Sequence, residues 1–156
     1  MSLLPGEERG TQMTYEEVVD QINQIRRFGN LAGVEVAGRM LKALGSPQAG
    51  IPLIHIAGTN GKGSVSAFLC AILREAGLRV GMFTSPHLVD FRERIQINGE
   101  MISKEDTQRI GVQLLAMDFG VQPTMFDVTL AMAILYFKER GCDVMILETG
   151  LGGRLD

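Results

Sequence analysis

The chain has 156 residues, the size of one domain, and 46% of them are hydrophobic, which is enough for a core. The net charge of -3 and pI near 5.4 argue against a nucleic-acid partner, because such domains usually carry a basic excess. No apolar run reaches the ~18 residues of a membrane span, so no membrane role is expected. Cys70 and Cys142 stand far apart in apolar settings, and we expect buried, reduced thiols in a cytoplasmic protein.

The first part of the chain predicts two amphipathic helices. Residues 1–13 carry an acidic pair where a signal peptide needs a long apolar region, and we interpret them as a flexible leader. Thr14–Glu17 then reads as a capping box that opens a helix ending near Arg27. Apolar side chains recur at helical spacing again from Val34 to Leu44, where Gly45-Ser46-Pro47 ends the second helix.

Short apolar strands alternate with amphipathic helices over the rest of the chain. The strands are expected at 51–57, 78–83 and 144–147, a hairpin near 95–99, and the helices at 62–76, 103–119 and 124–140. We expect the first strand to be buried, with His55 as a satisfied core histidine. Such alternation predicts an α/β fold, a P-loop-type parallel sheet flanked by helices. The sheet is thin and ends at a glycine-rich loop, so we expect a truncated domain.

Residues suited to bind phosphate lie where the first strand meets the following helix. They are Gly58, Thr59, Asn60, Gly61, Lys62, Gly63 and Ser64. Glycines allow backbone N–H groups to turn toward an anion, the helix N-terminus adds its dipole, and Lys62 adds a charge. The match to the general phosphate-loop pattern is imperfect, because Ile56 replaces a glycine and Gly63 a hydroxyl residue. The alternative is a tight turn with a solvated lysine, but the coincidence of all four features favours a nucleotide.

Polar groups also follow the other two strands. Glu148 ends a buried strand, where open α/β sheets place their ligands, and it fits a Mg²⁺ ligand. The alternative is a solvated carboxylate or one paired with Arg154. Ser85 lies in a loop after the second strand and can offer a hydroxyl to a metal, and Arg92 and Arg94 can reach a phosphate or carboxylate. Read alone, these would be ordinary loop residues.

Three motifs together closely resemble the folylpolyglutamate synthase and dihydrofolate synthase family, a branch of the Mur ligase superfamily. The motifs are His55–Ser64, then Thr84–Leu88 with Phe91–Ile95, then Leu147–Asp156. The resemblance implies that ATP phosphorylates a folate or pteroate carboxylate, and that the amino group of glutamate attacks the acyl phosphate to form an amide. It implies ATP and Mg²⁺ as cofactors, and L-glutamate and dihydropteroate or folate as small-molecule substrates.

The resemblance also assigns residues. Gly58 to Ser64 hold the ATP phosphates, with Lys62 as the catalytic residue. Ser85 and Glu148 hold Mg²⁺, whereas the phosphate-loop pattern alone gives that role to the hydroxyl of Ser64. The pteroate or folate contacts are Phe28, Gly29, Asn30, Leu31, Thr124, Met125, Phe126, Asp127, Leu155 and Asp156. Asp127 stands where relatives usually have Glu, and it can equally be the third residue of a capping box begun by Thr124. Thr149 replaces a usual valine, which we interpret as a packing detail.

In this interpretation residues 14–156 are the N-terminal part of the ATP-binding domain, the Mur ligase central domain. The C-terminal glutamate-ligase domain is absent from the sequence, so we expect the chain alone not to catalyse the ligation. Two alternatives stay open. One is another Mur-type or cyanophycin-type ligase with a different acceptor, and the other is a non-catalytic nucleotide-binding module.

Overall fold

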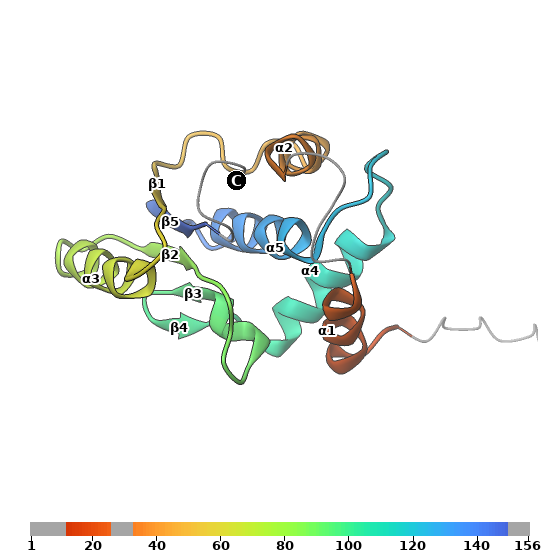
Figure 1. Cartoon of the computed structure of the whole chain (residues 1–156), viewed down its shortest axis with the longest axis horizontal. Helices are drawn as coiled ribbons and strands as arrows, with labels where there is room; N and C mark the ends of the chain where they lie inside the picture. Colours follow the sequence, from red (N-terminus) through yellow and green to blue (C-terminus); the bar gives the residue numbers. More distant parts are fainter. Residues whose placement is uncertain (1–11, 26–32, 150–156) are drawn as a thin grey trace, which may run out of the picture.

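The computed structural model describes residues 12–25 and 33–149. In these two ranges a five-stranded sheet is covered by helices on both faces (Figure 1). The strands are β1 (Leu53–Ile56), β2 (Val80–Phe83), β3 (Ile95–Ile97), β4 (Glu100–Met101) and β5 (Val144–Glu148). The helices are α1 (Tyr15–Gln24), α2 (Gly33–Ala43), α3 (Lys62–Glu75), the 3-10 helix η1 (Phe91–Arg94), α4 (Lys104–Ala116) and α5 (Met125–Glu139). No helix in the described ranges has the length and apolar character needed to cross a membrane.

The sheet combines a parallel core with an antiparallel edge. Its strand order is β1-β5-β2-β3-β4, with β5 parallel to both β1 and β2. The expected parallel sheet is therefore confirmed for these three strands. β3 and β4 are antiparallel to their neighbours and are joined at Asn98-Gly99, where both residues have positive φ of 50° and 82°. This is the turn that the Asn-Gly pair predicts, because a two-residue hairpin loop needs left-handed backbone.

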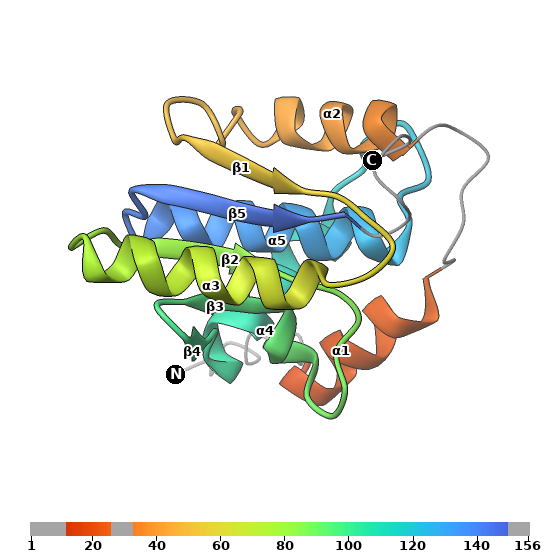
Figure 2. The same ribbon diagram turned by 60° about the vertical axis from the view of Figure 1, so that its left-hand side comes forward.

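The two faces of the sheet carry helical layers of different size. Figure 2 shows α3 alone in front of the sheet and α5 behind it. α3 covers a small cluster that contains Cys70 and Val80. On the other face α5 lies against the strands, and α1, α2 and α4 pack on α5. The buried side chains on this second face, Phe83 and Phe137 among them, form the larger core.

Local sequence signals position the ends of the helices. Thr14 and Glu17 make the reciprocal hydrogen bonds of a capping box at the start of α1, as predicted. Ser103 accepts a hydrogen bond from the backbone of Asp106 at the start of α4.

Both predicted buried cysteines are buried and free, and burial raises the pKa of the Cys142 thiol to about 11. At neutral pH this thiol is therefore held protonated and unreactive.

Two expectations about burial are wrong. β1 is not a buried strand, because within the described residues it pairs on one side only, with β5. Its side chains alternate between exposed and half-buried, so His55 is exposed and is not a core histidine. Leu53, on the same face as His55, is 46% exposed. The apolar run predicted burial correctly for β5, whose five residues are all buried between two neighbouring strands.

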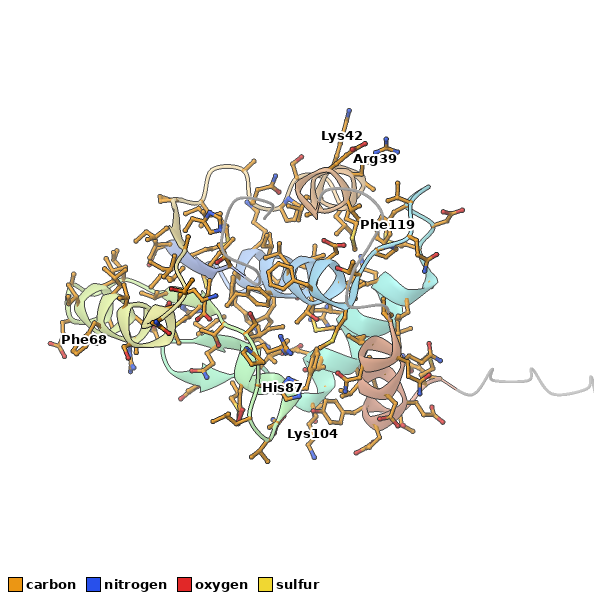
Figure 3. All side chains as sticks on the ribbon, viewed as in Figure 1. Arg39, Lys42, Phe68, His87, Lys104 and Phe119 are labelled. Atoms are coloured by element: carbon orange, nitrogen blue, oxygen red, sulfur yellow. The ribbon has the colours of Figure 1, made fainter. Side chains whose placement is uncertain are left out.

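The apolar face that helical spacing predicts for α3, formed by Val65, Phe68, Leu69, Ile72, Leu73 and Ala76, is only partly confirmed. The helix packs on the sheet through Leu69, Cys70 and Leu73, and Ser66 is also buried. Val65, Phe68 and Ile72 face outward, and Phe68 is 71% exposed (Figure 3). Apolar residues surround this helix on most sides, so helical spacing alone did not identify the face that the sheet covers.

Candidate functional site

The predicted phosphate and metal residues meet at one edge of the sheet. The three parallel strands β1, β5 and β2 all end at this edge (Figure 2). The segment after β1 holds Lys62, β5 ends in Glu148, and Ser85 follows β2. Residues separated by more than twenty positions in sequence are therefore neighbours in space, because the carboxyl ends of parallel strands lie side by side.

The phosphate loop connects β1 to the N-terminus of α3. Gly58 and Gly61 have φ of 149° and 74°, a region that side-chain-bearing residues rarely adopt. Gly61 is the N-cap of α3, and no side chain caps the first backbone N–H groups. The first turn also contains no acidic residue. The start of this 14-residue helix therefore offers unpaired donors and a positive dipole to an anion. Thr59, Asn60, Gly63 and Ser64 are all exposed around it.

The Lys62 side chain reaches across the edge to the end of β5. Its Nζ donates a hydrogen bond of 2.8 Å to the backbone carbonyl of Thr149. The backbone N–H of Thr149 in turn donates to the carbonyl of Ile56, at 2.9 Å. The ammonium group is thereby held close enough to the Glu148 carboxylate to attract it. The carbonyl contact was not predicted, because a backbone acceptor leaves no signal in the sequence.

Glu148 is a buried carboxylate, 5% exposed. Burial raises its pKa, because the charged form is separated from water. The attraction of Lys62 and a hydrogen bond from the backbone N–H of Ser85 act in the opposite direction, but burial is the larger effect. Lys62 and Ser85, predicted from separate motifs, thus both interact with Glu148, one through charge and the other through a backbone hydrogen bond.

The donor set fits a hard divalent cation such as Mg²⁺. The described part of the chain holds no group of three or more His, Cys, Asp and Glu that could bind a metal. Mg²⁺ does not need one, since it is usually bound by one or two protein oxygens together with phosphate oxygens and water. Glu148 offers a carboxylate whose burial outweighs the attraction of Lys62, so a cation would stabilise its charged form. Ser85 offers a hydroxyl, and its backbone N–H already bonds Glu148.

The residues assigned to the pteroate or folate contact separate into three groups. Thr124 and Asp127 form a capping box at the start of α5, in which Asp127 Oδ2 accepts from the backbone N–H and from the hydroxyl of Thr124, both at 2.8 Å. The capping alternative for Asp127 is therefore confirmed. Met125 and Phe126 pack against the core, and the Phe126 ring meets Phe83 edge-on at 5.4 Å. Phe28, Gly29, Asn30, Leu31, Leu155 and Asp156 lie outside the described residues, as does Arg154.

A cavity of about 190 Å³ opens beside the phosphate edge, on the α5 face of the sheet. Its walls are Leu53, His55, Phe126, Leu130, Leu147, Glu148 and Thr149. His55 and Thr149 were not predicted as site residues. The strand alternation contained a signal for His55, because the parity that places Leu53 on this face also places His55 there.

The loop after β2 is held by its own charged side chains. Arg92 pairs with Asp90 at 2.8 Å and lowers the pKa of that carboxyl, and Arg94 donates from Nε to His87 Nδ1 at 2.7 Å. Burial and Arg94 lower the pKa of His87, which Figure 3 places at this loop. Within the described chain both arginines therefore engage loop side chains, and their contact with a phosphate or carboxylate stays a prediction.

No family model matches the chain. Individual known proteins do match it, and they agree with the family that the motifs resemble. The chain is 44% identical over 151 residues to a probable bifunctional folylpolyglutamate synthase/dihydropteroate synthase of Halobacterium salinarum, covering 92% of this chain and 18% of that protein. It is 42% identical over 150 residues to the dihydrofolate synthase/folylpolyglutamate synthase of Bacillus subtilis, covering 91% and 35%. The chain is homologous to the folylpolyglutamate and dihydrofolate synthases. It spans about a third or less of the length of these two relatives.

Solved structures of folylpolyglutamate synthases share the fold. The Thermotoga maritima enzyme matches with a TM-score of 0.81 and 42% identity, covering 91% of this chain and 34% of that one. The Mycobacterium tuberculosis enzyme complexed with ADP matches with a TM-score of 0.82 and 33% identity, covering 91% and 33%. A folylpolyglutamate synthase complex with AMPPCP and folate matches with a TM-score of 0.79 and 36% identity, covering 92% and 37%. The expected α/β class and its relation to this family are therefore confirmed.

Proposed function

We propose that the chain is the N-terminal part of the ATP-binding domain of a ligase that adds L-glutamate to dihydropteroate or folates. The observation that carries the proposal is the meeting of Lys62, Glu148 and Ser85 at the ends of three parallel strands. Homologues are named for this activity, and related structures hold ADP, or AMPPCP with folate. In this proposal residues 1–13 are a leader, the glutamate-ligase domain lies in the part of the relatives that the chain does not span, and the protein is cytoplasmic.

The proposed reaction needs little covalent chemistry from these residues. The γ-phosphoryl group of ATP moves to the acceptor carboxylate, ADP leaves, and the glutamate amino group then displaces phosphate from the acyl phosphate. The phosphate loop holds the nucleotide with its N–H groups, and Lys62 neutralises charge on the transferring group. Mg²⁺, held by Glu148 and Ser85, would draw electron density from the phosphate oxygens. Phe126 and the cavity beside it would position the acceptor.

The test is substrate dependence in the full-length protein that carries this sequence. We expect ATP to be consumed only when L-glutamate and either dihydropteroate or a folate are both present. Turnover with a cyanophycin-type or other Mur-type acceptor, and none with any pteroate or folate, would favour the other ligase class. Binding of Mg²⁺ and ATP without turnover on any acceptor of the panel would favour a non-catalytic nucleotide-binding module.

Glu148→Gln tests the proposed metal site through two opposite effects. We expect Mg²⁺-dependent turnover to fall by roughly 10²-fold or more, because a charged ligand is replaced by a neutral one. In the ligand-free protein we expect a higher Tm at neutral pH, since the raised pKa means that folding disfavours the charged form. The stability lost to this charge is regained as pH falls and Glu148 becomes protonated, so the Tm difference between the two proteins should shrink in acid.

The matched control for this experiment is Glu75→Gln, which removes an exposed carboxylate at the end of α3. It should change neither turnover nor the pH dependence of Tm. A Glu148→Gln protein that keeps its Mg²⁺-dependent activity would remove Glu148 from the metal site. Thermal unfolding monitored by circular dichroism between pH 4 and 8 supplies the stability measurement.

A further inference from the structure

The loop between β2 and η1, residues 84–90, is attached to the side chain of Glu93 on η1. Oε2 of Glu93 accepts a hydrogen bond of 2.9 Å from the backbone N–H of Leu88. Both carboxylate oxygens also accept from the backbone N–H of Val89, each at 3.3 Å. These bonds, the one from Leu88 first, lower the pKa of the Glu93 carboxyl, so the fold stabilises its charged form. A charged acceptor holds an N–H group more strongly than a neutral oxygen does.

The backbone beside this carboxylate holds the beginning of the same loop. The hydroxyl of Thr84 donates to the carbonyl of Glu93 at 3.4 Å, and the N–H of Thr84 donates to the carbonyl of Arg94 at 3.0 Å. Ser85 follows directly and lies between this attachment and the one made by the carboxylate. Its own N–H donates to Glu148. The position of Ser85 relative to Glu148 therefore depends on how the loop is attached on both sides.

Burial contributes little to the shape of the loop at its tip. Leu88 and Val89 are 92% and 90% exposed, and Pro86 is exposed as well. These side chains are not held against the core, so the hydrogen bonds from their backbone to Glu93 are what fixes this part of the loop. Removing the carboxylate should leave the tip free to move, since the apolar side chains offer no replacement for it.

We propose that Glu93 is a positioning residue, which keeps Ser85 beside Glu148 for the divalent cation that accompanies ATP. The proposal rests on the proposed function for the roles of Ser85 and Glu148. Glu93 acts through the backbone of the loop and is not itself a ligand of the cation. Mg²⁺ requires its oxygen ligands in near-ideal geometry, and groups behind the ligands tune its affinity. A ligand on an unattached loop binds more weakly, because the loop must become ordered when the cation binds.

The experiment measures how much Mg²⁺ strengthens the binding of AMPPCP to the full-length protein that carries this sequence. The Kd of AMPPCP is determined by calorimetry in excess Mg²⁺ and again in EDTA, and the ratio of the two values is the gain from Mg²⁺. For Glu93→Ala we expect this gain to fall by roughly 3- to 10-fold, with the Kd in EDTA unchanged. Glu93→Gln keeps one acceptor oxygen, so its gain should lie between those of Glu93→Ala and the unmodified protein.

Hydrogen exchange supplies a second measurement, which needs neither Mg²⁺ nor nucleotide. We expect the amides of residues 84–90 to exchange faster in Glu93→Ala than in the unmodified protein. Glu100→Ala is the matched control, because Glu100 is an exposed glutamate on β4, in the neighbouring hairpin. It should change neither the exchange of the loop nor the gain from Mg²⁺.

Ser85→Ala separates this inference from the proposed function. It should itself reduce the gain from Mg²⁺, and adding Glu93→Ala should then cause little further loss, because Glu93 acts through Ser85. If Ser85→Ala reduces the gain but Glu93→Ala lowers only Tm, Glu93 merely caps η1 and the inference is overturned, while the proposed metal site stands. An unchanged gain in Ser85→Ala would remove Ser85 from the metal site, and the inference would fall with that part of the proposed function.

Discussion

Replacing Lys62 with alanine is expected to abolish ATP-dependent ligation in the full-length protein, with kcat falling by roughly 10²- to 10³-fold or more. Lys62 is the first residue of α3, and its Nζ lies 2.8 Å from the Thr149 carbonyl beside Glu148. In the nucleotide complex we expect the ammonium group to exchange this carbonyl for phosphate oxygens, because an anion is the stronger partner. Removing it leaves the charge of the transferring phosphoryl group without its cation.

The loss should concern catalysis and not folding. Lys62 is half-buried and contributes one hydrogen bond to the ligand-free fold, so we expect a change in Tm of no more than a few degrees. Lys42→Ala is the matched control, since Lys42 is an exposed lysine on α2, at the outer side of the molecule in Figure 3. It should retain full activity. A Lys62→Ala protein with turnover within tenfold of the unmodified protein would overturn the assignment of the phosphate loop.

Gly81→Ala is expected to cause a large loss of stability for the addition of a single methyl group. Gly81 lies in β2, which pairs with β3 on one side and β5 on the other. A Cβ at this position would lie 2.6 Å from Cγ of Phe137 and 2.7 Å and 2.8 Å from two further ring atoms. The Phe137 ring is fully buried, so it has no free space to move into. Overpacking of this kind costs roughly 1–3 kcal/mol or more.

We expect Tm of the full-length protein to fall by roughly 2–10 °C, or the variant to be insoluble. Gly81→Ala combined with Phe137→Leu should recover part of the loss, because the shorter side chain removes the ring that the new methyl group contacts. Gly38→Ala is the matched control: Gly38 lies within α2, and a Cβ there would meet nothing within 4 Å. It should raise stability by roughly 0.5–1 kcal/mol through helix propensity. Equal effects of the two glycine variants would contradict the packing argument.

The features that the sequence predicted correctly depend on contacts between neighbours in the chain. The capping boxes at Thr14 and Thr124 close within three residues, and the Asn98-Gly99 turn within two, so each was readable without the fold. The strands and helices were likewise predicted from the spacing of apolar residues within each short segment, so their order along the chain was also readable without the fold. The ends of parallel strands share one edge by topology, which is why the convergence of Lys62, Ser85 and Glu148 followed from the strand assignment.

Burial and pairing were decided by tertiary structure. β1 and β5 are both short apolar strands, but only β5 has a neighbour on each side within the described chain, so only β5 is fully buried. The sheet selects one side of the mostly apolar helix α3 and leaves Phe68 outside. The loop arginines engage Asp90 and His87, partners that are only a few residues away but that no motif identifies.

By itself, the sequence of this protein determined an α/β fold with a phosphate loop and a carboxylate at the same sheet edge, because these depend on short-range patterns and on strand direction. Only the tertiary structure decided that the Thr149 carbonyl accepts a hydrogen bond from Lys62 and that a cavity opens between the sheet and α5. These two facts require distances between atoms from β5, α3 and α5. Such distances are fixed by how the helices pack on the sheet, which no local pattern encodes.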